Sequence, residues 1–277
     1  MTSRSAFQPA ITIISRTGSL LQSLSPPPAR LAQPISRATF LRDIDPADCL
    51  EIGPFDNPQI KGDGVRYFDV LDTESLRKRA RRHGRSFSGV PRIDFVSPTG
   101  TLGVIDERFR SVFSAHVVEH QPDLVRHFQD VARILEPGGI YHVVCPDKRY
   151  CFDHFIPLSS LDEVLHAHRT GRTNNAPATI RNHVANITHN RAWKHWLGWH
   201  GRPKIADDPG IATIAAVECA RAARGEYVDV HAWMFTPATF RDIVGTLCRE
   251  DLIPFTLTLV TQTRFGEQEF FARLLRR

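Results

Sequence analysis

From residue 43 onward, short runs of β-branched and aromatic residues alternate with longer amphipathic segments. The short runs predict seven strands, at 49–53, 65–70, 92–96, 111–115, 140–145, 255–260 and 269–274. Apolar positions at helical spacing, together with capping residues, predict helices at 73–83, 123–135 and 237–249. Such alternation is typical of a parallel sheet with helices on its faces. We therefore expect an α/β fold with a doubly wound, mostly parallel seven-stranded sheet.

Residues 147–235 break this alternation and read as one long insertion after the fifth strand. The segment holds many of the histidines and several turn signals. Insertions of this length usually have a function, such as a lid or a substrate wall. Both of its ends meet the carboxyl edge of the predicted sheet, which is where open α/β sheets bind ligands. We expect the insertion to cover a ligand site at that edge.

The first 42 residues differ from the rest of the chain in charge. Their five arginines have no acidic counterpart and account for the whole net charge of +5, so residues 43–277 are formally neutral. Binding to nucleic acid needs a clustered basic face, so we expect no nucleic-acid partner. The segment has the composition of an organellar transit peptide or of a weakly ordered terminus. We expect residues 1–42 to be a flexible extension before one domain at 43–277.

The cysteines and the apolar runs exclude several other classes of protein. The five cysteines are scattered and form no C-x-x-C pair, which argues against a zinc ribbon or a disulfide framework. No apolar run approaches the roughly 18–20 residues that a membrane-spanning helix needs. We expect a cytoplasmic protein without a membrane span, with organellar import as the alternative.

A candidate nucleoside site lies at the ends of the first two predicted strands. Gly53 follows the first strand, where a glycine lets the backbone approach a nucleotide closely. Asp69 ends the second strand, 16 residues later, and its carboxylate can accept hydrogen bonds from both hydroxyls of a ribose. A strand, a glycine turn and an acid in this order form a nucleoside-binding layout.

Three segments, at 51–53, 113–120 and 133–139, resemble the motifs of class I S-adenosylmethionine-dependent methyltransferases, and the resemblance extends over about 48–277. It implies a Rossmann-like fold with S-adenosylmethionine as the cofactor. Phe55 and Asn57 stand where this family usually has glycines, although asparagine tolerates a left-handed backbone. The donor-binding residues that the resemblance implies are Glu51, Ile52, Gly53, Asn57, Asp69, Ser114, Ala115 and His116.

Transfer of the methyl group to an oxygen or nitrogen acceptor is helped by a base with a pKa near neutrality, a role that suits histidine. The candidate catalytic residues are His116, His120, Asp147, His154 and His231. We expect Asp147, His154 and His231 to converge from the two ends of the insertion, beside Gly53 and Asp69. We expect the acceptor to be a small molecule or a glycan with a sugar-type hydroxyl.

Other interpretations remain open. Residues 116–120 fit the H-x-x-E-H zinc-protease pattern, but the preceding strand and Pro122 argue against the continuous helix that it needs, so we expect no metal there. Eleven of the 13 histidines lie between His116 and His200, and surface, core and pocket positions explain them more simply than metal binding. A methyltransferase fold kept as a non-catalytic binding module is a further alternative. A nicotinamide-dependent oxidoreductase is disfavoured because no G-x-G-x-x-G follows the first strand.

Overall fold

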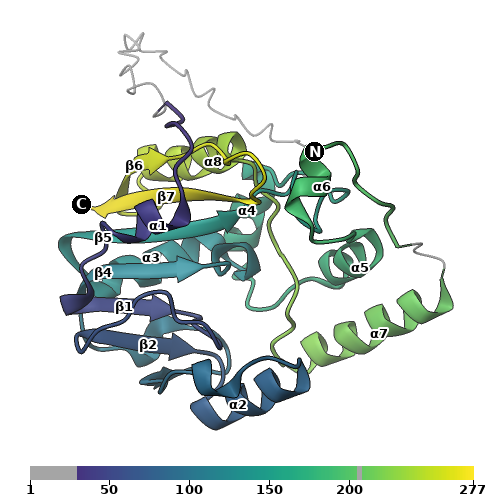
Figure 1. Cartoon of the computed structure of the whole chain (residues 1–277), viewed down its shortest axis with the longest axis horizontal. Helices are drawn as coiled ribbons and strands as arrows, with labels where there is room; N and C mark the ends of the chain where they lie inside the picture. The colour runs from purple at the N-terminus through teal and green to yellow at the C-terminus, as the bar shows by residue number, and fades with distance from the viewer. Residues whose placement is uncertain (1–29, 205–207) are drawn as a thin grey trace, which may run out of the picture.

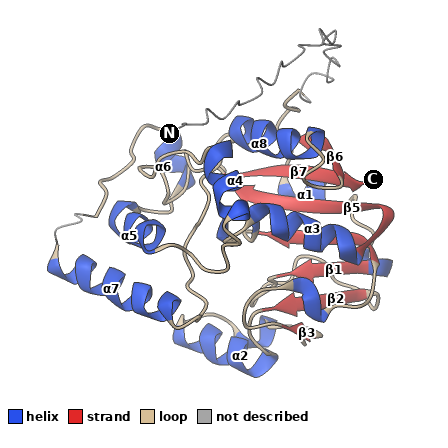
Figure 2. Ribbon diagram, turned by 180° about the vertical axis from the view of Figure 1, so that it is seen from behind, coloured by secondary structure: helices blue, strands red, loops and turns tan. Residues whose placement is uncertain are grey.

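The computed structural model describes residues 30–204 and 208–277, and a seven-stranded sheet lies at its centre (Figure 1). The strand order is β3-β2-β1-β4-β5-β7-β6. The pairs from β3 to β5 are parallel, and β7 is antiparallel to both of its neighbours. Helices α3 and α8 cover one face of the sheet (Figure 2), and α1 lies against the other. The predicted α/β fold with a mostly parallel seven-stranded sheet is confirmed.

The strands follow the predicted ranges to within two residues at each end, except for β3 and β5. β3 is shorter than expected, and β5 starts earlier because Leu135 already pairs with Phe109 of β4. The strands are β1 (Cys49–Ile52), β2 (Val65–Asp69), β3 (Phe95–Val96), β4 (Phe109–Ala115), β5 (Leu135–Pro146), β6 (Phe255–Val260) and β7 (Glu269–Arg276).

Capping residues explain where the helices of the α/β core begin. The Asp72 carboxylate accepts a hydrogen bond from the Ser75 N–H, at 2.7 Å, at the start of α2. Thr236 forms a capping box with Thr239 at the start of α8, where Pro237 takes the first helical position. These helices are α1 (Arg37–Leu41), α2 (Thr73–Arg82), α3 (Leu124–Ile134) and α8 (Pro237–Arg249).

The inserted segment forms four helices beyond the carboxyl ends of the parallel strands (Figure 1). α4 packs against α3, and α5 and α7 share a small apolar core of their own that includes Ile180 and Ala215. These helices are α4 (Leu161–Arg169), α5 (Pro177–Asn186), α6 (Ala192–Trp196) and α7 (Pro209–Ala223). No helix of the described residues has both the length and the apolar character needed to cross a membrane.

The part of the expected N-terminal extension that the structure describes is packed on the sheet. Phe40 of α1 is fully buried and stacks on Phe271, with ring centroids 4.8 Å apart. Arg37 forms an ion pair with Glu269 at 2.6 Å, and the Ala32 N–H donates to a backbone carbonyl of β6. The expected boundary at residue 42 is therefore wrong for residues 30–42, because their apolar and charged groups find partners on the sheet. Residues 1–29 lie outside the described residues.

Replacing Phe40 with alanine should destabilise the domain. Removing a fully buried phenylalanine ring leaves a cavity and costs about 3–5 kcal/mol of unfolding free energy, measurable by chemical denaturation. Phe265 is 72% exposed and provides a matched control, for which the alanine variant should differ from the wild type by less than about 0.5 kcal/mol. Equal small losses in both variants would contradict a structural role for α1.

Candidate active site

A cavity of about 440 Å³ opens at the carboxyl ends of β1, β2 and β4. Loops from the sheet form one wall, and residues 173–175 and 222–229 of the insertion form the other. Its volume is in the range of sites that bind small molecules and cofactors. Seven of the expected donor-binding residues line it, namely Glu51, Ile52, Gly53, Asn57, Asp69, Ala115 and His116.

The loop after β1 turns twice through left-handed backbone conformations. Gly53 has φ +72°, and a Cβ atom there would lie 3.0 Å from Cγ2 of Val117. Phe55 has φ +45°, which residues other than glycine rarely adopt. The left-handed backbone conformation that the sequence suggested at Asn57 is therefore found at Phe55 instead. Phe55 thus adopts a backbone conformation that normally requires glycine. Strained backbone of this kind clusters at ligand sites.

Glu51 holds this loop in place. Its carboxylate accepts hydrogen bonds from the backbone N–H groups of Gln59, at 2.9 and 3.0 Å, and Ile60, at 2.9 Å. Burial raises the pKa of Glu51 to about 7, although the two N–H donors act in the opposite direction. The Glu51 carboxylate therefore acts mainly to hold the loop that shapes the cavity.

Asp69 ends β2 with its carboxylate in the cavity wall. The side chain is buried, and burial raises its pKa to about 6. The backbone N–H groups of Leu71, Val70 and Phe55 act in the opposite direction, with the Leu71 N–H 3.3 Å from Oδ1, and a carboxylate has about four acceptor sites. The ionised group can therefore accept hydrogen bonds from ribose hydroxyls, as expected from its position after β2.

Ser114 does not line the cavity, in contrast to the expectation. Its side chain is fully buried and forms a hydrogen bond of 2.7 Å with the Tyr141 hydroxyl. The Ser114 hydroxyl is turned instead towards the buried face of the sheet, where Tyr141 packs against Phe128 of α3. The motif around the end of β4 thus contributes Ala115 and His116 to the cavity.

His116 follows β4 with φ +55° and is held between two glutamates. Its Nε2 lies 2.6 Å from Oε1 of Glu269, and its Nδ1 lies 3.4 Å from Oε1 of Glu119. Burial alone lowers the pKa of His116, but the two carboxylates outweigh it and raise the pKa to about 9. A histidine that is protonated at neutral pH is a poor proton acceptor, which argues against His116 as the base.

His120 also lies in the cavity wall, with a different environment. Its Nδ1 lies 3.2 Å from the Val230 carbonyl oxygen and 3.4 Å from a carboxylate oxygen of Asp229. Burial, followed by the charge of His231, lowers the pKa of His120. His120 therefore presents a neutral ring to the cavity.

His231 lies one layer behind His120, outside the cavity wall. The two rings meet edge to face, with centroids 4.6 Å apart. Nδ1 of His231 donates to the Asp153 carboxylate at 2.5 Å. Burial lowers the pKa of His231, but Asp153 outweighs it and raises the pKa.

Glu119 completes this buried group, and the sequence analysis did not assign it a role. Its side chain is fully buried, with Oε1 3.8 Å from Nε2 of His231 and 4.0 Å from Nε2 of His120. Among the described residues, neither carboxylate oxygen has a hydrogen-bond partner. The H-x-x-E-H pattern contained this glutamate, but Val118–His120 form a single 3-10 turn, so the two histidines of the pattern share no helical face.

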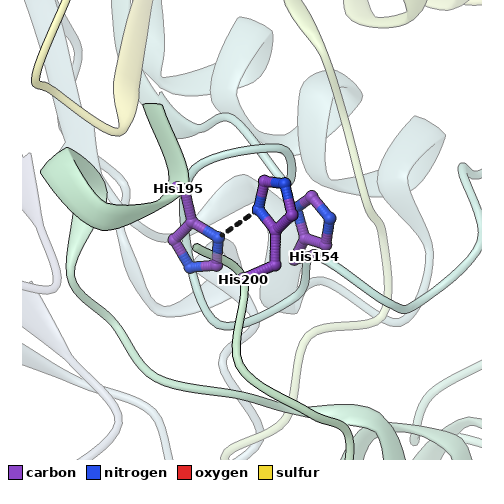
Figure 3. A group of neighbouring side chains, drawn as sticks. All are labelled: His154, His195 and His200. Carbon is purple, nitrogen blue, oxygen red and sulfur yellow. Dashed lines mark hydrogen bonds between the residues drawn. The ribbon is translucent and has the colours of Figure 1, made fainter. Parts of the chain in front are cut away.

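Asp147 and His154 do not line the cavity, and their side chains have partners outside it. The Asp147 carboxylate forms an ion pair with Arg149, at 2.5 Å, and accepts a hydrogen bond from the Thr263 hydroxyl. His154 stacks on His200, with centroids 3.8 Å apart, beside His195 (Figure 3). The predicted convergence of Asp147, His154 and His231 beside Gly53 and Asp69 is therefore wrong. The turn after β5 places Asp153 beside His231 and the neighbouring His154 beside His195 of α6.

Comparison with known protein families gives a match in the middle of the sheet. Residues 63–143, from β2 to most of β5, match the family described as Methyltransferase domain. This match identifies a methyltransferase domain in the chain. The resemblance noted in the sequence is thus confirmed, together with the cofactor that it implied. No protein of curated function matches this methyltransferase.

Solved structures with a similar arrangement include other methyltransferases. A SAM-dependent methyltransferase from Aquifex aeolicus shares 10% identity over 83% of both chains, with a TM-score of 0.40. The complex of DhpI with SAH shares 14% identity over 83% of this chain and 76% of that one, with a TM-score of 0.39.

Donor affinity should depend on the ionisation of Asp69. Asp69→Asn should weaken binding of S-adenosylhomocysteine by roughly 1.5–3 kcal/mol, because a charge-assisted acceptor is lost. As the pH falls below the Asp69 pKa of about 6, the wild type should lose affinity by up to about tenfold per unit. Calorimetry between pH 5 and pH 8 measures both effects. The wild-type and Asp69→Asn affinities should approach each other at low pH, and parallel pH profiles would reject Asp69 as the ribose acceptor.

Proposed function

We propose that this methyltransferase transfers a methyl group from S-adenosylmethionine to a hydroxyl group of a small molecule or sugar. The observation that carries the proposal is the shared cavity, in which the donor-type loop at Gly53 and Asp69 faces residues of the insertion. An acceptor held by the insertion would meet the donor at the carboxyl edge of the sheet. The formal neutrality of residues 43–277 also favours a small acceptor over a polyanion.

The reaction is an in-line displacement. The acceptor oxygen forms a bond with the methyl carbon while the bond between that carbon and the sulfonium sulfur breaks. The electron pair of the broken bond stays on sulfur, which becomes the neutral thioether of S-adenosylhomocysteine. Because the donor is already activated, the protein mainly aligns oxygen, carbon and sulfur. The hydroxyl proton must also leave the acceptor.

We infer that the acceptor hydroxyl loses its proton beside the group formed by Glu119, His120 and His231. Of the five residues expected to act in acid–base chemistry, His120 alone combines a place in the cavity wall with a lowered pKa. Glu119 and His231 lie directly behind it. We expect the acceptor hydroxyl to bind against His120, on the same edge of the sheet as the donor.

Alanine at His120 should reduce turnover much more than donor affinity. Loss of a group that assists proton removal lowers the rate by roughly 10²–10⁴-fold, whereas the affinity for S-adenosylhomocysteine should change by less than about threefold, or about 0.65 kcal/mol. The assay follows transfer of a labelled methyl group from the donor to a panel of sugars and small hydroxylated compounds.

His154 supplies the matched control because it lies outside the cavity lining. His154→Ala should keep turnover within a few-fold of the wild type. Equal losses in both variants would contradict the assignment of His120. Donor binding without transfer to any member of the panel would instead favour the non-catalytic binding module.

A further inference from the structure

Glu119 places a carboxylate in the interior of the protein without the partners that such a group normally needs. The side chain is fully buried, and neither oxygen has a hydrogen-bond partner among the described residues. Burying an ionised carboxylate is costly unless it is paired or binds a metal. The polar side-chain atoms around Oε1 are three imidazole nitrogens, with Nδ1 of His116 at 3.4 Å, Nε2 of His231 at 3.8 Å and Nε2 of His120 at 4.0 Å.

Contacts on the far side of both rings determine which nitrogen faces Glu119. Nδ1 of His120 lies 3.2 Å from the Val230 carbonyl oxygen, which can only accept, so this nitrogen carries the proton. Nδ1 of His231 likewise donates to the Asp153 carboxylate at 2.5 Å. Once both Nε2 atoms are free of a proton, as metal ligands must be, their lone pairs face Glu119. Histidines that bind metals are typically held in this way, by a carbonyl or carboxylate on the other nitrogen.

We propose that Glu119, His120 and His231 bind one divalent transition-metal cation. Two imidazoles and one carboxylate form a donor set that suits Zn²⁺ and Fe²⁺. One ligand atom from each residue lies within 4.8 Å of the other two. A point equidistant from atoms so spaced is at most about 2.5 Å from each, so shifts of a few tenths of an ångström give the roughly 2.0–2.2 Å distances of zinc ligands.

The position of the cation gives it a role in the reaction, and this consequence rests on the proposed function. Because His120 is in the cavity wall, the cation lies just behind that wall, and three protein ligands leave a coordination position open. A hydroxyl bound there loses its proton to water more readily, since a metal ion lowers the pKa of a bound oxygen. The resulting alkoxide attacks the methyl carbon as described above.

A second group of ring nitrogens provides an internal comparison. One ligand atom each from His154, His195 and His200 also fall within 4.8 Å of one another. These rings already satisfy one another, because Nδ1 of His195 and Nδ1 of His200 are hydrogen-bonded at 3.1 Å. His154 and His200 are also stacked nearly parallel, at 10°, so their in-plane lone pairs do not meet at one point (Figure 3). This second group serves as the control in the test.

The test is direct cation binding by the full chain after removal of metals with a chelator. Titration with Zn²⁺ by calorimetry, and with Co²⁺ by visible absorption, should give one cation per chain. Glu119→Gln should weaken binding at least about 100-fold, whereas His195→Ala, which disrupts the second group, should bind as the wild type does. No binding by the wild type, or loss in His195→Ala with retention in Glu119→Gln, would overturn the proposal.

Thermal unfolding separates loss of the ligand from loss of the fold. Zn²⁺ should raise the melting temperature of the wild type and leave that of Glu119→Gln unchanged. Because Glu119→Gln also removes the charge beside His116, each protein's own metal-free melting temperature is the baseline for its response to Zn²⁺. If Glu119→Gln does not fold, His120→Ala in the cavity wall gives the same comparison.

These measurements use neither donor nor acceptor, so their outcome is independent of the proposed methyl transfer. The catalytic consequence has its own readout, which is turnover before and after chelation. Chelation should reduce turnover at least tenfold while the affinity for S-adenosylhomocysteine stays within about twofold. Turnover that is undiminished in metal-free protein would overturn the catalytic role of the cation.

Discussion

The parallel pairing of β1 between β2 and β4 is the constraint on which the site depends. Ile52 pairs with Phe68 on one side and with Ser114 on the other, so the three strands end at the same level. The residues that follow, among them Gly53, Asp69 and His116, therefore meet at one edge although they are far apart in the chain. Parallel strands in register make this edge the natural place for a ligand.

Two buried glutamates at this edge, Glu51 and Glu119, have different surroundings and different roles. Glu51 accepts backbone N–H bonds from the loop after β1, which satisfies the carboxylate and shapes the cavity. Glu119 accepts no hydrogen bond from the backbone and lies among three histidine rings instead. The first carboxylate stabilises a loop, whereas the second, without hydrogen-bond donors, is accounted for by the proposed cation.

The sequence was a good guide wherever the determining interaction is local. Asp72 and Thr236 cap the helices that follow them, and Asp69 ends β2 in the cavity wall as expected. It was a poor guide to groups whose partners are distant. Phe40 is buried by Phe271, a contact between opposite ends of the chain that no periodicity around Phe40 reveals.

The sequence by itself determined the succession of strands and helices along the chain, the glycine turn after β1 and the acid that ends β2. These features depend on hydrophobic spacing and capping over a few residues. Only the tertiary structure decided which histidines meet. His120 and His231 are brought together by the return of the insertion to the sheet, while the turn after β5 sends His154 to α6. The insertion follows no repeating pattern, so the placement of its side chains depends on long-range packing.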